Sequence, residues 1–303
     1  MPLKPCQTNE TRTRLRSMET SHSNLPDEHN SASLSPQAPS TSTTSGWEEV
    51  RGHQLYWELH GSENERTVVL LHHGLGSVRS WRRQIPAFVA RGWRVLAYDR
   101  WGYGRSDARP AFEPNFLRHD AMETRNLLDM FGIENACFVG HSDGGSIALL
   151  LAAETPSLFE RLVVVAAHIY FEPKMVSGIK GIIADAQAPP LRTALKREHG
   201  DRAEDLVRAW VDHWLETDLS SLSLIDELPK ITCPTLVVQG ELDEHATPQH
   251  AQDIADGVKD GHLWLIPGVH HMPMHEIPEN FNTLVLNFME GELPSQTKTG
   301  TPT

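Results

Sequence analysis

The sequence has 303 residues, of which 39% are hydrophobic and 22% are charged, and its formal net charge is −13. Four basic and four acidic side chains cancel within residues 1–45, so all of the negative charge belongs to the rest of the chain. Because such a body repels phosphate groups, we expect no nucleic-acid partner. Three cysteines are too few for a disulfide framework, and they favour a reducing, cytoplasmic location.

The two ends of the chain differ in composition from the rest. Residues 1–45 are rich in Ser, Thr, Pro and Asn, so they cannot bury enough apolar surface to offset the entropy of ordering. We therefore expect disordered tails at 1–45 and 291–303, on either side of one domain that spans 46–290. The stretch 11–17 (TRTRLRS) leaves an organellar signal open as an alternative location. No apolar run reaches the roughly 18 residues needed to span a bilayer, so we expect no membrane span.

From Trp47 onward, short apolar runs alternate with helical patterns, which is typical of β–α–β units and a parallel sheet. We expect strands at 47–51, 53–60, 67–71, 95–98, 136–139, 162–167, 235–240 and 262–266. We expect helices at 78–91, 115–131, 144–155, 247–257 and 279–290. Helical patterns alone occupy about 171–228, which we interpret as an inserted helical lid. The sequence therefore predicts an α/β fold with an eight-stranded, mostly parallel sheet and helices on both of its faces.

One pentapeptide, Gly140-His141-Ser142-Asp143-Gly144, fits the pattern Gly-x-Ser-x-Gly. It lies directly between an apolar strand and an apolar helix, where a sharp turn exposes the serine oxygen at the carboxyl end of a sheet. Glycine on either side relieves the Cβ clashes of such a turn, and the helix N-terminus favours developing negative charge. The pattern predicts that Ser142 is a nucleophile. A glycine-rich turn with a helix-capping serine is the alternative.

A second glycine-rich loop, His72-His73-Gly74-Leu75-Gly76, follows strand 67–71. A tetrahedral oxyanion needs two preorganised N–H donors about 3 Å away. We expect the backbone N–H of Asp143 to supply one donor and that of Leu75 the other, because the flanking glycines allow close approach. A glycine turn without a ligand role remains the alternative.

Five segments together resemble the α/β-hydrolase-fold enzymes in order and spacing. They are HHGLGS at 72–77, DRWGYGRSD at 99–107, GHSDGG at 140–145, GELD at 240–243 and HHMPMHEIP at 270–278. The resemblance covers residues 47–290. The turn HSDGG, with an acid directly after the serine, is most similar to the valacyclovir-hydrolase (biphenyl-hydrolase-like) branch and its bacterial esterase relatives.

The resemblance implies a catalytic triad in the chain order Ser, Asp, His. Asp243 stands in the family's Gly-x-x-Asp position and would orient the histidine, with Glu244 as a carboxylate nearby. His271 would be the base, although His270 stands where the family usually has glycine, so the choice between the two imidazoles stays open. The following Met-Pro pair favours His271. The resemblance gives segment 99–107 a role as scaffold.

Several other side chains are candidates for substrate binding. Four residues form the core of the predicted lid, namely Trp210, Trp214, Met175 and Ile179, and one or two of them can also line an acyl or alcohol pocket. Tyr170, with His168, follows strand 162–167 and is expected near the same pocket. The 17 histidines form no metal-binding pattern, so we expect no metal and no cofactor.

The carboxylate of Asp143 allows two interpretations. It can simply favour the positive end of the helix dipole. Alternatively, a carboxylate beside the oxyanion site repels developing negative charge unless a cation offsets it, which predicts substrates that carry an ammonium group near the acyl carbon.

Taken together, these features predict a cofactor-free serine hydrolase that cleaves a small carboxylic ester or thioester through an acyl-enzyme on Ser142. The same triad also serves C–C bond hydrolases, amidases, perhydrolases and some lyases, which remain alternatives. A ligand-binding receptor that keeps the triad without turnover is an alternative of another class. The substrate and the oligomeric state are left open by the sequence.

Overall fold

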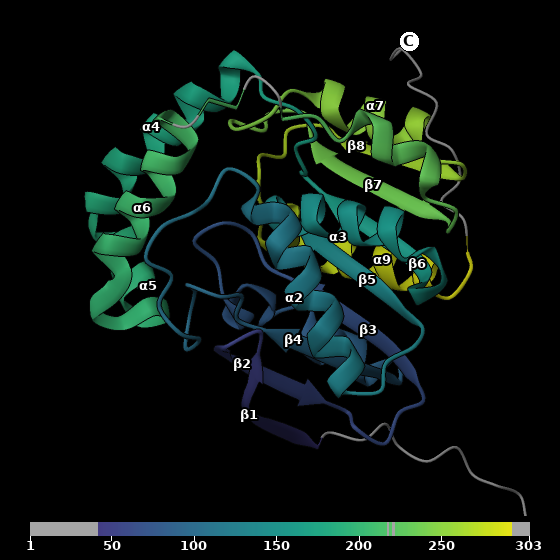
Figure 1. Cartoon of the computed structure of the whole chain (residues 1–303). Helices are drawn as coiled ribbons and strands as arrows, with labels where there is room; N and C mark the ends of the chain where they lie inside the picture. Colours follow the sequence, from purple (N-terminus) through teal and green to yellow (C-terminus); the bar gives the residue numbers. More distant parts are fainter. Residues whose placement is uncertain (1–41, 217, 220–221, 293–303) are drawn as a thin grey trace, which may run out of the picture. The chain divides into compact units, whose positions relative to one another are not determined.

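The computed structural model describes residues 42–216, 218–219 and 222–292 (Figure 1). All of these described residues belong to one compact unit. Our predictions for residues 1–41 and 293–303 therefore lie outside the described residues. None of the helices within the described ranges is long and apolar enough to cross a membrane.

Both predicted tail boundaries need correction. The first strand begins at Thr43, which pairs with His60 of the next strand, so three residues of the predicted tail belong to the sheet. At the other end, the backbone N–H of Gly291 donates to the carbonyl of Phe288 and completes the last helix. Composition did not reveal these boundaries because both segments are held by backbone hydrogen bonds, which do not require apolar side chains.

The eight strands form one sheet in the order β1-β2-β4-β3-β5-β6-β7-β8. Their bounds are Thr43–Val50 (β1), His53–His60 (β2), Arg66–Leu71 (β3), Trp93–Tyr98 (β4), Ala136–His141 (β5), Phe159–Val165 (β6), Thr235–Gly240 (β7) and Gly261–Ile266 (β8). Strand β2 runs antiparallel to β1 and β4, and the remaining pairs are parallel. The predicted eight-stranded, mostly parallel sheet is confirmed.

Nine α-helices accompany the sheet within the described residues. They are α1 (Ile85–Ala90), α2 (Phe116–Met130), α3 (Asp143–Glu154), α4 (Pro173–Gln187), α5 (Pro189–His199), α6 (Ala203–Glu216), α7 (Pro248–Gly257), α8 (Pro273–Glu276) and α9 (Pro278–Met289). Four short 3-10 helices are η1 (Val78–Trp81), η2 (Pro156–Leu158), η3 (Gly200–Arg202) and η4 (Ile225–Lys230).

The single helix predicted at 78–91 is wrong, because the segment forms η1 and α1 instead. Ser77 caps η1 and accepts a hydrogen bond from the N–H of Arg79. Pro86 lies at the start of α1, and its missing N–H and its ring prevent a helix from running through this point.

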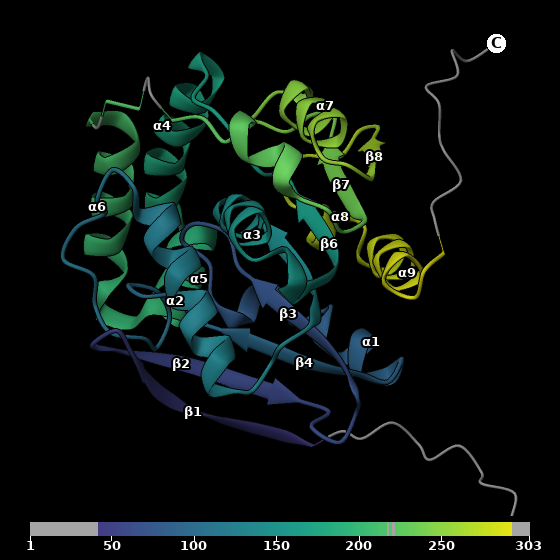
Figure 2. The same cartoon turned by 45° about the vertical axis from the view of Figure 1, so that its right-hand side comes forward.

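Helices cover both faces of the sheet, because alternate residues of the buried strands point in opposite directions. On β3, Val69 and Leu71 pack in the core with α2, α3 and α7, whereas Val68 and Leu70 pack with α1 and α9. Figure 2 shows α2 and α3 on one side of β3 and β4, with α1 and α9 on the other.

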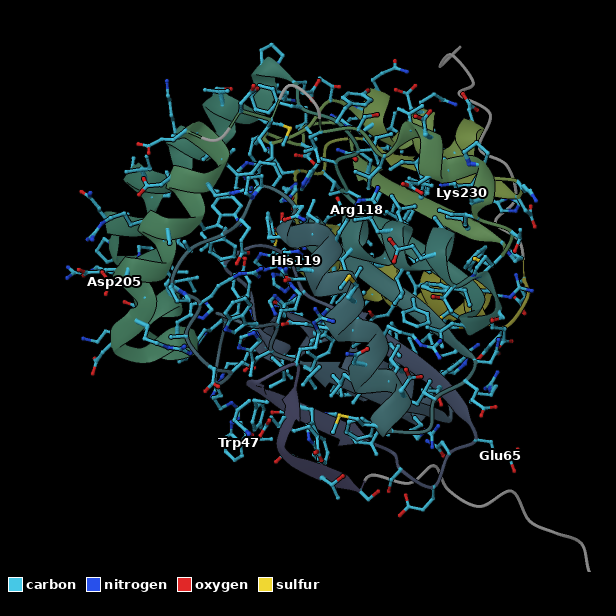
Figure 3. The ribbon with its side chains drawn as sticks, viewed as in Figure 1. Trp47, Glu65, Arg118, His119, Asp205 and Lys230 are labelled. Atoms are coloured by element: carbon cyan, nitrogen blue, oxygen red, sulfur yellow. The ribbon has the colours of Figure 1, made fainter. Side chains whose placement is uncertain are left out.

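Helices α4, α5 and α6 occupy the segment predicted as a lid and lie side by side (Figure 1). The lid packs on the core through buried residues such as Met175 and Trp210, and Figure 3 shows Asp205 of α6 on the outer side. The chain enters and leaves the lid at one place, where Tyr170 and Ser223 form an isolated antiparallel bridge.

Helix α2 turns two acidic residues, Asp120 and Glu123, toward the buried interior. Both oxygens of Asp120 accept hydrogen bonds from guanidinium groups, at 2.6 Å from Arg100 and 2.7 Å from Arg109. Glu123 lies 3.7 Å from the imidazole of His53. Burial, reinforced by the charge of Asp120, raises the pKa of Glu123 to about 8.

Ionisation of Glu123 therefore opposes folding. The folded-state pKa of Glu123 lies above that of an unfolded glutamate. The stability that the protonated carboxyl contributes is therefore fully present below about pH 4 and is lost as the pH rises through about 8. We expect Glu123→Gln to raise Tm by a few degrees at pH 9 and to change it little at pH 5. Thermal scans at both pH values test this, with the exposed Glu134→Gln as control. A Tm difference that does not depend on pH would contradict the assignment.

Candidate active site

Ser142 lies in the turn between β5 and α3 and has φ 53° and ψ −121°. A non-glycine residue in this region is strained, and the turn is held by a hydrogen bond of 2.8 Å from the Ser142 N–H to the carbonyl of Val165. A Cβ on Gly144 would lie 2.2 Å from the carbonyl oxygen of Leu71, so only glycine fits there. The sequence pattern therefore corresponds to a strained turn that places Ser142 against a cavity.

His271 and Asp243 approach each other from the loops that follow β8 and β7. The Nδ1 atom of His271 lies 2.9 Å from Oδ2 of Asp243. Gln239 also donates to Oδ2 at 2.7 Å, while the backbone N–H groups of His245 and Ala246 donate to Oδ1 at 2.8 and 3.1 Å. Both oxygens of this fully buried carboxylate are thus satisfied, which fixes its orientation.

Electrostatics favour opposite charges on this pair. Burial of Asp243 opposes its ionisation, but the charge and hydrogen bond of His271 outweigh burial and lower the pKa of Asp243. Burial likewise favours a neutral His271, yet the charge and hydrogen bond of Asp243 raise the pKa of His271. The imidazole is therefore a stronger base than a free histidine.

The other two candidates beside this pair, His270 and Glu244, have different neighbours. His270 points outward, and its Nδ1 lies 3.2 Å from Oε2 of Glu276. Glu244 is half exposed and accepts a hydrogen bond from the backbone N–H of His271 at 3.3 Å. Of the two neighbouring histidines, His271 is the one that contacts Asp243.

Four further histidines lie near His271, three of them in the cavity wall and the fourth, His141, with its ring 4.9 Å from the ring of His271. Burial is the largest cause that lowers the pKa of each, to about 3 for His73, His168 and His245 and well below the ordinary value for His141. The Nε2–H of His141 donates to the backbone carbonyl of His271 at 2.8 Å. These imidazoles are neutral at ordinary pH, so they add no positive charge beside the base.

Leu75 and Asp143 line the cavity beside Ser142, and each has a backbone N–H without an acceptor among the described residues. Leu75 has φ 60°, and no group in the described part of the chain accepts a hydrogen bond from its N–H. Asp143 is the first residue of α3, whose first N–H groups have no acceptor within the helix. These are the two donors that the sequence predicted for an oxyanion.

The Asp143 side chain is fully buried and has several neighbours. Its Oδ2 accepts a hydrogen bond of 3.1 Å from Nε1 of Trp210 and lies 3.7 Å from Nη2 of Arg100. Its Oδ1 has no hydrogen-bond partner among the described residues and lies 3.8 Å from Nε2 of His168. A Cβ on Gly74 would lie within 2.8 Å of both Asp143 and Trp210, so close packing explains this glycine.

Ser142, Leu75, Asp143 and His271 line one cavity of about 280 Å³ beneath the lid. Its apolar walls include all four residues of the predicted lid core, Trp210, Trp214, Met175 and Ile179, where the sequence led us to expect one or two. Asp243 lies behind His271, to which it is bonded.

The expectation that Tyr170 lies at the pocket is wrong. Its ring stacks on His250 at 4.1 Å, and its hydroxyl donates to Asp253 of α7 at 2.8 Å, away from the cavity. A residue that follows a strand end can point to either side, and the sequence did not show that Asp253 would satisfy the hydroxyl.

Sequence reasoning missed two residues that support the site. Gln239 was detectable, because it is the one polar side chain at the end of an otherwise apolar strand and stands four residues before Asp243. Arg100 gave no comparable signal, since its contacts with Asp120 and Asp143 join segments that are far apart in the sequence.

Comparisons with known proteins show the family to which the chain is related. A family profile described as "alpha/beta hydrolase fold" matches residues 67–201. The putative carbamate hydrolase RutD of Caulobacter sp. (strain K31) is 31% identical over 265 residues, covering 78% of this chain and 96% of that protein. The serine hydrolase BPHL of Homo sapiens is 30% identical over 263 residues, covering 82% of this chain and 88% of that protein.

Solved structures show the same fold. A serine hydrolase from the polyaromatic-hydrocarbon-degrading bacterium Cycloclasticus zankles matches with a TM-score of 0.69, covering 82% of this chain and 99% of that chain. Its sequence is 20% identical, so the similarity concerns the fold.

The contact with Asp243 predicts which histidine activates Ser142. We expect a fluorophosphonate probe to label Ser142 in the unmodified protein and not in Ser142→Ala. His271→Ala should slow labelling by several orders of magnitude, since loss of such a base costs on the order of 10⁶ in kcat. His270→Ala is the matched control and should label at nearly the normal rate. Timed labelling with mass spectrometry gives the rates, and an inactive His270→Ala beside an active His271→Ala would reverse the assignment.

Proposed function

This chain belongs to the α/β-hydrolase-fold family, and from that premise we propose that it is a serine hydrolase that cleaves a small carboxylic ester or thioester. The observation that carries the proposal is the 2.9 Å contact between His271 and Asp243, beside a cavity that Ser142 also lines. Because Nδ1 of His271 donates to Asp243, its Nε2 is unprotonated and available as a base.

The proposed reaction forms an acyl-enzyme. His271 removes the hydroxyl proton of Ser142 while the oxygen attacks the carbonyl carbon, and the resulting oxyanion is stabilised by the N–H groups of Leu75 and Asp143. The imidazolium, stabilised by Asp243, then protonates the departing alcohol or thiol. A water molecule, deprotonated by His271, releases the acid and restores Ser142.

The cavity supports a small, partly apolar substrate. Its volume of about 280 Å³ is at the lower end of the range for small-molecule sites, and Trp214, Met175 and Ile179 form much of its wall. A relative named as a putative carbamate hydrolase favours carbamates as a second candidate class.

A panel of small esters, thioesters, carbamates and amides with the same acyl group tests the proposal. We expect the ester or thioester to give the highest kcat/KM, with activity reduced by a factor on the order of 10⁶ in Ser142→Ala. Activity should rise with pH to a plateau, because only the neutral imidazole of His271 can act as the base. Since the pKa of His271 is raised, the rise should lie at a higher pH than for a free histidine. A carbamate preferred over the matched ester would support the second candidate. Binding of panel compounds without turnover would indicate a receptor.

Asp143 supports a finer proposal, that the preferred acyl group carries an ammonium. Its buried Oδ1 has no hydrogen-bond partner among the described residues, while Oδ2 already has Trp210 and, at 3.7 Å, Arg100. We expect Asp143→Asn to lower kcat/KM for aminoacyl esters by about ten- to hundredfold relative to simple acyl esters, since a hydrogen bond to a charged group contributes about 1.5–3 kcal/mol.

The control for this prediction is Trp210→Phe, which removes the donor to Asp143 but keeps the carboxylate. It should retain the preference for aminoacyl esters. If the ratio of the two kcat/KM values is the same in the unmodified protein and in Asp143→Asn, the carboxylate has no role in selecting an ammonium group.

A further inference from the structure

The last residue of lid helix α5, His199, lies between two loops of the sheet domain. Its side chain is buried, with 3% of its surface exposed. One neighbouring loop follows β3 and contains Leu75, and the other follows β4 and contains Gly104. His199 contacts both loops through its two ring nitrogens.

These contacts determine which nitrogen carries the proton. The backbone N–H of Gly104 can only donate, and it does so to Nδ1 of His199 at 2.8 Å, so Nδ1 must be the unprotonated nitrogen. The carbonyl of Leu75 can only accept, and it lies 2.9 Å from Nε2, so Nε2 must carry the hydrogen. Burial lowers the pKa of His199, which favours this neutral form.

The Leu75 carbonyl belongs to the residue whose N–H is proposed to stabilise the oxyanion. With φ 60°, Leu75 occupies a backbone region that is unfavourable for a residue with a Cβ. Relaxation toward negative φ would rotate its N–H relative to its carbonyl. Since His199 holds the carbonyl, relaxation must either break that hydrogen bond or turn the N–H away from Ser142.

We propose that His199 is a positioning residue: a lid side chain that holds Leu75 in the conformation that directs its N–H at the oxyanion. The inference rests on the proposed function, because it assigns His199 a role in the same acyl transfer. His199 does not line the cavity in the described structure, so it acts through the backbone of Leu75.

Other contacts attach the same corner of the lid without reaching Leu75. Arg202 of η3 donates through Nη2 to the carbonyls of Gly104 and Ser106, each at 2.8 Å. Glu198 accepts a hydrogen bond of 2.9 Å from the hydroxyl of Ser77. Arg202→Leu therefore weakens the attachment of the lid and leaves the His199–Leu75 hydrogen bond in place, which makes it the matched control.

The test compares His199→Phe, which keeps a ring and removes both hydrogen bonds, with His199→Gln, whose amide can accept from Gly104 and donate to Leu75. With a p-nitrophenyl ester we expect His199→Phe to lower kcat by roughly 10- to 100-fold and to change KM by less than about threefold. This loss is smaller than the roughly 10²- to 10³-fold loss of kcat that follows removal of an oxyanion donor, because the N–H of Leu75 is still present. His199→Gln should restore kcat to within several-fold of the unmodified protein. Arg202→Leu should leave kcat near normal even where its Tm falls.

Nitrogen NMR of the unmodified protein gives a second measurement that does not need turnover. The His199 signals, identified by their loss in His199→Gln, should show an unprotonated Nδ1 and a protonated Nε2. The opposite tautomer would overturn the inference, as would equal losses of kcat in His199→Phe and Arg202→Leu or no rescue by glutamine. If the unmodified protein cleaves no acyl compound, the proposed function fails, whereas the tautomer still tests the contact with Leu75.

Discussion

Helix α3 begins so close to the end of β3 that there is no room for a Cβ on Gly144 beside the Leu71 carbonyl. This contact determines the rest of the site. It brings Ser142, at the start of α3, next to the loop that continues from β3 and carries Leu75. Ser142 and the backbone of Leu75, from separate β–α units, therefore line one cavity. His271 and Asp243 come from two further loops at the same edge of the sheet, where parallel strands end together.

Buried charge is the second constraint. Beneath the cavity, Arg100 and Arg109 approach the carboxylates of Asp120 and Asp143, so two positive and two negative groups lie together out of water. Removal of one partner from such a group is strongly destabilising, because it leaves an uncompensated buried charge. The acid beside Ser142 is thus tolerated by the fold, and its free Oδ1 remains available for a ligand.

The sequence predicted most of the sheet because strands buried on both faces appear as continuous apolar runs, as at residues 68–71 of β3. It also pointed to Ser142, whose motif encodes a local turn with particular glycines, and, through the resemblance to a known family, to Asp243 and His271. It did not predict the break before Pro86, where one proline outweighs an apolar helical pattern. Nor did it place Tyr170 or Arg100, because their partners come from distant segments, and hydrogen-bond satisfaction over such distances leaves no local pattern.

The two ends of the lid lie next to each other, because Tyr170 and Ser223 form an antiparallel bridge. An insertion whose ends meet can change in length or content without displacing β6 or β7. Most of the apolar cavity wall belongs to this insertion, whereas Ser142 and His271 belong to the loops of the sheet. Substitutions in the lid can therefore change which substrates such a protein accepts, while the residues in the loops of the sheet stay the same. His199, the lid residue that we propose positions Leu75, is one on which that exchange would be constrained.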